Sequence, residues 1–298
     1  MGNKKLSKNA IIGYPAGIIT GITYGLNPLF GVPLMQNGAS VDSILFFRYG
    51  IAVLILGIFL LFTKQSFKVS INQLGILVLL GLLYSSSSIF LFEAYNYIAS
   101  GLATTLIFLS PVLVAIIMVF LRNIPSWPVW LSIFATFAGV ILMTQNDSSQ
   151  IINPIGMLLA ISSALAYSFF IIIINRSKKI SLISNTLLTF YALLTGTIIF
   201  LGKIMFAKEG ITTGIEGYTA WGYLIGLAIL PTIVSTATLA IATRNIGATK
   251  ASVLGVFEPI TAIIIGTFVF GETLTANIVI GILIAIIAVT FMIMSTKR

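Results

Sequence analysis

The segment GVFEPITAII, residues 255–264, places a carboxylate and a proline inside a long apolar run. Glu258 is costly to keep charged near the middle of a bilayer unless it is paired, hydrated or protonated, so an acid there is a functional residue by default. Pro259 removes a backbone donor and frees a carbonyl about one turn earlier. The two residues could together bind a cation, a hydronium ion or an ammonium group. Alternatively, Glu258 is a buried carboxyl group that bonds neighbouring hydroxyls for packing.

Arg48, within FFRYGIA (46–52), is a cation near one end of another apolar run. It could pair with an acid in the same core, hold a carboxylate through two parallel hydrogen bonds, or extend its apolar stem toward the membrane surface. Glu93, in FLFEAYNY (90–97), lies near the end of a third run. It could pair with Arg48, belong to a gate at the outer face, or lie solvated at the interface.

Polar side chains inside the apolar runs could line a cavity, because binding pockets combine apolar walls with a few placed polar groups. Tyr24, Tyr167 and Tyr191 are preferred, since they lie well inside their runs and at positions related by an internal repeat. Tyrosines elsewhere in membrane proteins gather at the interface. The wall candidates considered are Tyr24, Asn27, Tyr84, Tyr95, Tyr167 and Tyr191.

Hydroxyl groups and prolines in the same runs raise similar alternatives. Ser86, in YSSSS (84–88), and Ser235 could line a wet cavity or bond carbonyl groups four residues earlier in their own helices. Pro111 and Pro259 could bend helices around a cavity, either as static kinks or as hinges.

Apolar helices are the elements that must position these residues. The chain of 298 residues is 58% hydrophobic and 8% charged, whereas a soluble domain is roughly 25% charged. Lipid cannot satisfy the backbone groups of an open strand, so each apolar run is expected to be a helix. We expect ten spans, at 11–33, 43–62, 72–95, 101–121, 127–144, 154–174, 184–205, 219–242, 250–270 and 276–295.

Basic residues set the expected orientation. If both termini are cytoplasmic, ten spans place every lysine and arginine on the cytoplasmic side except Arg48, Lys203 and Lys208, as the positive-inside rule requires. We therefore expect a multi-pass protein of the cell (plasma) membrane with both termini in the cytoplasm. The net charge of +9 is spread over short polar gaps, so it does not indicate a nucleic-acid partner.

Enzyme chemistry is not expected. The sequence has no cysteine and no histidine, and its seven acidic residues are scattered along the chain, which leaves no cluster of metal ligands. No phosphate-binding glycine loop lies beside a lysine. We expect no cofactor and no metal, and any proton relay would have to use carboxylates, tyrosines or water.

Small residues recur every four positions along the first apolar run, which puts a smooth stripe on one face of a helix. Such a stripe allows close approach, either in static packing or in a contact that lets the first and sixth helices slide or rock. A shift of 143 residues finds a second stripe. The two stripes are Gly13, Gly17, Gly21 and Gly25, and Gly156, Ala160, Ala164 and Ser168.

The second half of the chain aligns with the first. ASGLATTLIFLSP (99–111) parallels GATKASVLGVFEP (247–259). Halves at 1–146 and 150–298 each hold five expected helices, and because five is odd the second half enters the membrane from the opposite side. The expected fold is an all-α membrane protein of ten transmembrane helices in two inverted five-helix repeats. The matched positions are Tyr24 with Tyr167, Arg48 with Tyr191, Ser110 with Glu258, and Pro111 with Pro259.

The chain resembles the drug/metabolite transporter superfamily, in its ten-helix EamA-like branch. The resemblance rests on GLATTLIFLSPVLVAII (101–117), on FFRYGIA, and most specifically on GATKASVLGVFEPITAIIIGTFVFGETLT (247–275). It implies an export or exchange permease for small metabolites, often amino acids, with a central cavity between inverted repeats. Ser110 stands where the second half has Glu258, and RNIP stands where it has FGET, so equal roles for the halves are not implied.

The residues and the resemblance together predict a secondary transporter that works by alternating access. The alternative is a flippase for lipids or lipid-linked substrates, which would expose a groove to lipid. The expected partners are a small-molecule substrate, the lipid bilayer and, if transport is coupled, protons, and the chain is expected to act as a monomer or weak dimer. Residues expected to bind substrate are Glu258, Tyr24, Asn27, Tyr167, Tyr191, Arg48, Ser86 and Ser235, and those expected in gating or packing are Glu93, Gly21, Gly25, Pro111 and Pro259.

Overall fold

The structure is a computed structural model of the chain that describes residues 8–98, 100–144, 153–207, 210–269 and 275–295. Within these residues the chain is helical and contains no strand. The helices are α1 (Lys8–Tyr24), α2 (Asn27–Gln36), α3 (Val41–Phe62), α4 (Ile71–Ala94), α5 (Ser100–Ile107), α6 (Ser110–Phe120), α7 (Trp127–Thr144), α8 (Pro154–Arg176), η1 (Lys178–Ile180), α9 (Asn185–Ala207), α10 (Gly217–Ala228), η2 (Ile229–Val234), α11 (Ser235–Ile246), α12 (Ala248–Val253), η3 (Leu254–Val256), α13 (Phe257–Val269) and α14 (Ala276–Ser295).

Seven helical runs in the described residues are long and apolar enough to cross a membrane. Each apolar segment expected from the sequence coincides with helix, and the protein is a multi-pass membrane protein. That all ten segments cross the bilayer remains a prediction, because the expected spans 101–121, 127–144 and 276–295 are not among these seven runs. The seven runs are Lys8–Gln36, Val41–Phe62, Ile71–Ala94, Pro154–Arg176, Asn185–Ala207, Gly217–Ile246 and Ala248–Val269. Shorter apolar stretches within helices cover Ser110–Phe120, Trp127–Gly139 and Val279–Ser295.

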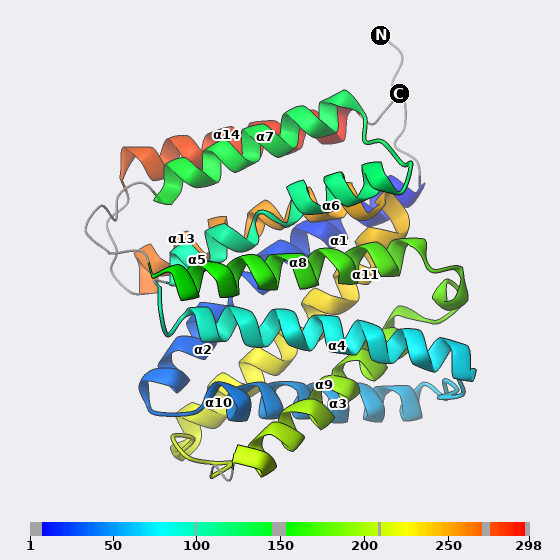
Figure 1. Cartoon of the computed structure of the whole chain (residues 1–298), viewed down its shortest axis with the longest axis vertical. Helices are drawn as coiled ribbons and strands as arrows, with labels where there is room; N and C mark the ends of the chain where they lie inside the picture. Colours follow the sequence, from blue (N-terminus) through cyan, green and yellow to red (C-terminus); the bar gives the residue numbers. More distant parts are fainter. Residues whose placement is uncertain (1–7, 99, 145–152, 208–209, 270–274, 296–298) are drawn as a thin grey trace.

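The helices stack in roughly parallel layers (Figure 1). Helices α7 and α14 pack against each other at the top of the view, and α3, α9 and α10 occupy the opposite end. Between them, α1 packs against α11 and α13, while α4 packs against α8 and α9. The interior of this stack is where the long apolar runs bring their polar residues together.

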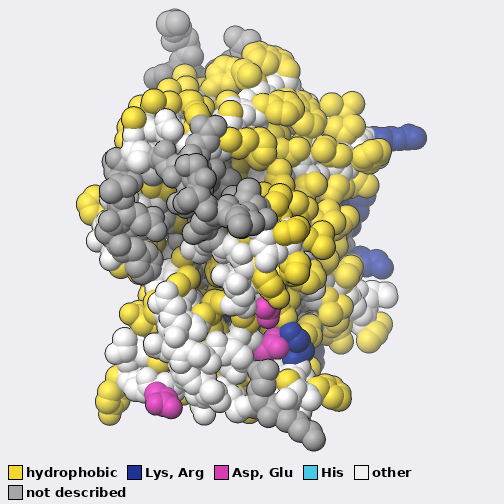
Figure 2. All heavy atoms as spheres, turned by 60° about the vertical axis from the view of Figure 1, so that its left-hand side comes forward, with side chains coloured by type: hydrophobic (Ala, Val, Ile, Leu, Met, Phe, Trp, Pro, Cys, Tyr) yellow, Lys and Arg dark blue, Asp and Glu magenta, His cyan; other side chains and the backbone are white. Residues whose placement is uncertain are grey.

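Large apolar side chains cover much of the surface (Figure 2). Phe62, Phe120, Phe206 and Phe268 are between 82% and 92% exposed. Removing apolar surface from water is worth roughly 25 cal/mol per Å², so a surface of this kind is stable only when lipid covers it. The bilayer is therefore the solvent of this fold.

Helix interruptions lie inside several apolar runs of the described chain, each beside a proline. Proline lacks a backbone donor and clashes with the preceding turn, so it breaks or distorts a helix at a defined place. The interruptions are the break between α1 and α2 before Pro28, the break between α5 and α6 before Pro111, the π-helix η2 around Pro231, and the 3₁₀ turn η3 before Pro259.

Gly17, Gly21 and Gly25 face α13 and the turn before it, while Gly13 faces the end of α11. A Cβ atom on Gly21 would lie 2.8 Å from the Cβ of Phe257 and 2.9 Å from the backbone oxygen of Leu254. At Gly25 it would lie 2.5 Å from the backbone oxygen of Glu258. The glycines therefore allow the backbones of α1 and α13, which both lie beside helix interruptions, to come into contact near Glu258.

Replacing Gly25 with Ala is expected to lower the melting temperature of the purified protein. The added Cβ would meet the backbone oxygen of Glu258 at 2.5 Å and the Cβ of Thr261 at 2.7 Å, so α1 and α13 must separate. Overpacking of this kind costs about 1–3 kcal/mol. Gly222→Ala is the matched control, because nothing lies within 4 Å of a Cβ there. Equal melting temperatures for wild type and Gly25→Ala would contradict the close contact.

Candidate functional site

Arg48 is the most deeply buried charge among the described residues, with 0% of its surface exposed. Its Nε donates a hydrogen bond to the Thr232 hydroxyl at 2.5 Å, and its Nη2 donates to the Pro231 carbonyl at 3.0 Å. Thr232 in turn donates to the Leu227 carbonyl at 2.7 Å. Both acceptors belong to the π-helix η2, whose irregular backbone makes a carbonyl group available. Arg48 thus bonds neutral groups rather than an acid.

Several buried polar atoms in the described chain have no hydrogen-bond partner. They include Nη1 of Arg48, the Tyr84 hydroxyl and both side-chain polar atoms of Asn27. Arg48, Tyr24 and Ser235 lie within electrostatic reach of the Tyr84 hydroxyl, although none of these contacts has hydrogen-bond geometry. Each buried polar group left without a partner costs about 1–3 kcal/mol. A cluster of them indicates a site that water or a ligand completes.

Glu258 lies in the first turn of α13 and is 8% exposed. The positive end of the helix dipole favours a negative charge at this position. Tyr24, Tyr95 and Tyr167 lie within electrostatic reach of its carboxylate. No described residue forms an ion pair or hydrogen bond with that carboxylate, so the alternative of a carboxyl group bonded by hydroxyls for packing is not what the structure contains.

Aromatic rings connect the surroundings of Arg48 with those of Glu258. Tyr24 stacks on Tyr167 at 5.8 Å between ring centroids, and Tyr167 lies 6.4 Å from Phe170. Phe170 lies 5.2 Å from Tyr84, which stacks on Tyr49 at 5.7 Å. Helices α1, α8, α4 and α3 each contribute to this row. The two unpaired charges therefore share one aromatic wall in the core.

The expected wall residues divide into those that the structure brings together and those that it does not. Tyr24 and Tyr167 lie within electrostatic reach of Glu258. Asn27 begins α2 two residues after Gly25, which packs against the backbone oxygen of Glu258. Ser235, the first residue of α11, donates to the carbonyl of Pro231 in η2 at 2.5 Å. Tyr191 lies elsewhere, because its hydroxyl donates to the Phe67 carbonyl at 2.7 Å. Its placement ties α9 to the segment before α4.

Ser86 is half-buried, and its neighbours in YSSSS make the interhelical contacts. Ser87 and Ser163 hydroxyls lie 3.0 Å apart, and the Ser163 hydroxyl also donates to the Ser87 carbonyl at 2.7 Å. The Ser88 hydroxyl lies 2.6 Å from the Tyr49 hydroxyl. These contacts join α4 to α8 and to α3. They fix the position of Tyr84 along α4 relative to those two helices.

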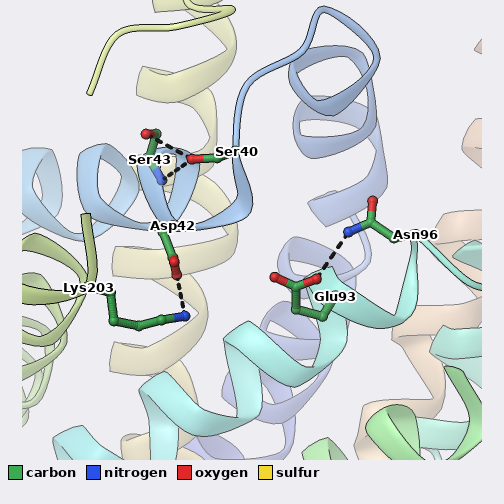
Figure 3. A network of polar contacts seen from close by, with 6 residues as sticks. All are labelled: Ser40, Asp42, Ser43, Glu93, Asn96 and Lys203. Carbon is green, nitrogen blue, oxygen red and sulfur yellow. Dashed lines mark hydrogen bonds and ion pairs between the residues drawn. The ribbon is translucent and has the colours of Figure 1, made fainter. Parts of the chain in front are cut away.

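Glu93 does not pair with Arg48. Its carboxylate accepts a hydrogen bond at 3.1 Å from Asn96, three residues further along the chain (Figure 3). At the same end of the helices, Lys203 on α9 forms an ion pair with Asp42 on α3 at 2.7 Å. Exposed pairs of this kind contribute about 0–1 kcal/mol. The ion pair joins α3, the helix that carries Arg48, to α9.

Sequence reasoning missed Thr232 and the role of Pro231 as a carbonyl acceptor. The signal that could have found them is the proline followed by a hydroxyl residue in mid-run, PTIVST (231–236), at a depth comparable with that of Arg48. Pro111 and Pro259 both lie beside helix interruptions, as a bend requires.

A bundle of apolar helices whose interruptions enclose buried, unpaired charges defines a polytopic membrane protein with a polar core, the general plan of membrane transporters. The family is then given by comparison. The EamA-like transporter family matches residues 11–145 and again residues 154–294. The chain belongs to this family, which points to a transporter rather than an enzyme and to a small molecule as its substrate.

Two further comparisons give a related sequence and a similar fold. An uncharacterized transporter of Archaeoglobus fulgidus is 27% identical over 182 residues, which cover 61% of this chain and 62% of the relative. The match thus spans less than two thirds of that relative. A crystal structure of another protein superposes with a TM-score of 0.73 over 96% of this chain and 98% of the other, at 13% identity. At that identity the likeness concerns the fold alone.

Proposed function

We propose that this protein is a secondary transporter that exports or exchanges small polar metabolites, such as amino acids, by alternating access. The observation that carries the proposal is the pair of buried opposite charges, Arg48 and Glu258, neither of which has an ionic partner among the described residues. A buried charge without a partner is strongly unfavourable. A substrate that carries both a carboxylate and an ammonium group would pair with both.

The charges and the free hydrogen-bond donors of the site indicate where the carboxylate and the ammonium group of the proposed substrate would bind. Nη1 of Arg48 and the Tyr84 hydroxyl are unoccupied donors, which suits a substrate carboxylate. Glu258, with the hydroxyls of Tyr24 and Tyr167 near it, suits an ammonium group or, in an alternative cycle, a proton. Asn27 supplies both a donor and an acceptor for further polar groups.

Alternating access requires that the site open to each side in turn. Arg48 and Glu258 are 0% and 8% exposed, so substrate reaches them only when helices move. The repeat supports a symmetric movement of 1–146 against 150–298, since one pair of matched positions makes similar contacts. Gly25 packs against the backbone oxygen of Glu258, and the matched Ser168 donates to the backbone oxygen of Ser110 at 3.4 Å.

The proposed setting is the cell membrane with both termini in the cytoplasm. The support is the distribution of basic residues, nearly all of which lie in the polar gaps of one side when ten spans are counted. A monomer suffices for the mechanism, because the residues of the site all come from one chain.

The test is an exchange assay in liposomes that contain the purified protein. Liposomes loaded with one unlabelled amino acid should take up labelled amino acid from outside faster than protein-free liposomes. A neutral sugar of similar size should not exchange, because it offers no charged group to Arg48 or Glu258. A panel of amino acids that all exchange at the protein-free rate would contradict the proposal.

A further inference from the structure

A cavity lies away from Arg48 and Glu258, where the ends of four helical runs meet. It has a volume of about 320 Å³, which is within the size range of small-molecule pockets, roughly 300–1,000 Å³. Its walls come from the end of α6, the turn and start of α7, the end of α8 and the junction of α11 with α12. The polar side chains that line it are Asn123, Ser126, Asn175, Thr249 and Lys250.

Lys250 gives this cavity an unbalanced positive charge. The side chain is half-buried and forms no ion pair or hydrogen bond within the described chain. No acidic residue is among those that line the cavity. Two further cations adjoin it in the chain, since Arg122 precedes Asn123 and Arg176 follows Asn175. The Arg176 side chain donates to the Leu121 carbonyl at 2.8 Å, which holds it at the same helix ends.

The remaining polar groups can donate hydrogen bonds to the same ligand. The hydroxyls of Ser126 and Thr249 and the amide of Asn123 are donors, and Lys250 contributes an ammonium group with three more. Asn175 is oriented by its bond to the Thr243 carbonyl at 3.1 Å. A cation ringed by donors and free of acids is the arrangement that binds a phosphate or carboxylate group.

We propose that this cavity is an anion site that binds a phosphate-type group through Lys250. Basic pockets between the ends of membrane helices accept the headgroups of anionic lipids, and the same donors fit a free phosphate ion or phosphorylated small molecule. These ligands share a phosphate group with one or two negative charges. The site is independent of the transport site, so the failure of either proposal leaves the other intact.

The experiment measures the melting temperature of the full chain with two probes. Inorganic phosphate is titrated into protein in a neutral detergent, and phosphatidylglycerol is compared with phosphatidylcholine in mixed micelles. We expect a concentration-dependent rise in melting temperature. A rise with phosphate alone identifies a soluble anion as the ligand, and a rise with phosphatidylglycerol alone identifies a lipid headgroup. Absence of a rise with both probes would overturn the proposal.

Variants separate the cavity from general surface charge. Lys250→Gln should weaken the apparent affinity about tenfold, as expected for the loss of one charged hydrogen-bond donor, and Lys250→Arg should retain it. Lys68→Gln is the matched control, because it removes the same charge from an exposed position outside the cavity. Should Lys250→Gln fail to fold, Asn123→Leu removes a donor at an exposed position and should also weaken binding. Equal responses of Lys250→Gln and Lys68→Gln would contradict the site.

Discussion

Glu258→Gln is expected to reduce exchange of amino acids at least tenfold in liposomes, while leaving the protein folded. Glutamine has the same shape but no charge, so in the proposed mechanism the substrate ammonium group loses the anion that Glu258 provides. A hydrogen bond to a charged group contributes about 1.5–3 kcal/mol, which corresponds to a factor of roughly 10–100 in binding. The measurement is the initial rate of labelled amino-acid uptake as a function of substrate concentration.

The pH profile gives a second and more specific result. In the wild type, a proton that neutralises Glu258 removes the partner of the substrate ammonium group, so exchange should decline as the pH falls. The Glu258→Gln variant cannot take up that proton, so its residual exchange should not depend on pH over the same interval. Rate and pH dependence equal to those of wild type would rule out the assigned role.

Glu93→Gln is the matched control for this prediction. The change is chemically identical, but Glu93 bonds only Asn96 at the exposed end of α4 among the described contacts. Exchange and its pH profile should therefore match wild type. If Glu93→Gln reduced exchange as strongly as Glu258→Gln, the effect would reflect the loss of any acid rather than the site around Glu258.

The positions of the helices could be predicted from the sequence because lipid imposes a simple rule. A long apolar run must satisfy its own backbone groups, so Pro154–Arg176 forms helix where 154–174 was expected and Asn185–Ala207 forms where 184–205 was expected. The interruptions were also predictable in kind, since Pro111 and Pro259 stand in mid-run in the sequence and each lies beside a helix interruption. Glu258 beside Pro259 was marked from the sequence as an acid in mid-run, and no described residue forms an ion pair or hydrogen bond with its carboxylate.

The partners of the site residues could not be predicted, because they depend on how each helix is rotated about its axis. Arg48 and Tyr191 are matched by the repeat, yet Arg48 points to η2 while Tyr191 bonds Phe67. A few tens of degrees of rotation decide whether a side chain enters the core, and no local pattern records it. The same reason hid Thr232, whose hydroxyl is one of many in mid-run and becomes important only because Arg48 reaches it.

Arg48→Met is expected to abolish the preference for substrates with a carboxylate that the proposed mechanism predicts. The thioether fills much of the same volume, but the free donor Nη1 is lost. The wild type should transport an amino acid at least tenfold better than the corresponding amine without a carboxylate, by the worth of a charged hydrogen bond. In Arg48→Met the two substrates should be transported at similar, low rates. A retained preference for the amino acid would show that Arg48 does not bind the carboxylate.

Arg48→Lys tests whether the substrate carboxylate is recognised by the geometry of the guanidinium group or by its charge alone. A lysine carries the same charge but only one nitrogen, so it cannot donate to Thr232 and Pro231, at 2.5 and 3.0 Å from two nitrogens of Arg48, and still present a free donor from a third. We therefore expect Arg48→Lys to behave much like Arg48→Met in its ratio of amino acid to amine, with a melting temperature closer to wild type because η2 keeps a cationic donor. If Arg48→Lys transported the amino acid with the wild-type ratio, the buried charge alone would suffice, and the η2 carbonyl and hydroxyl would have no part in orienting the guanidinium toward the substrate.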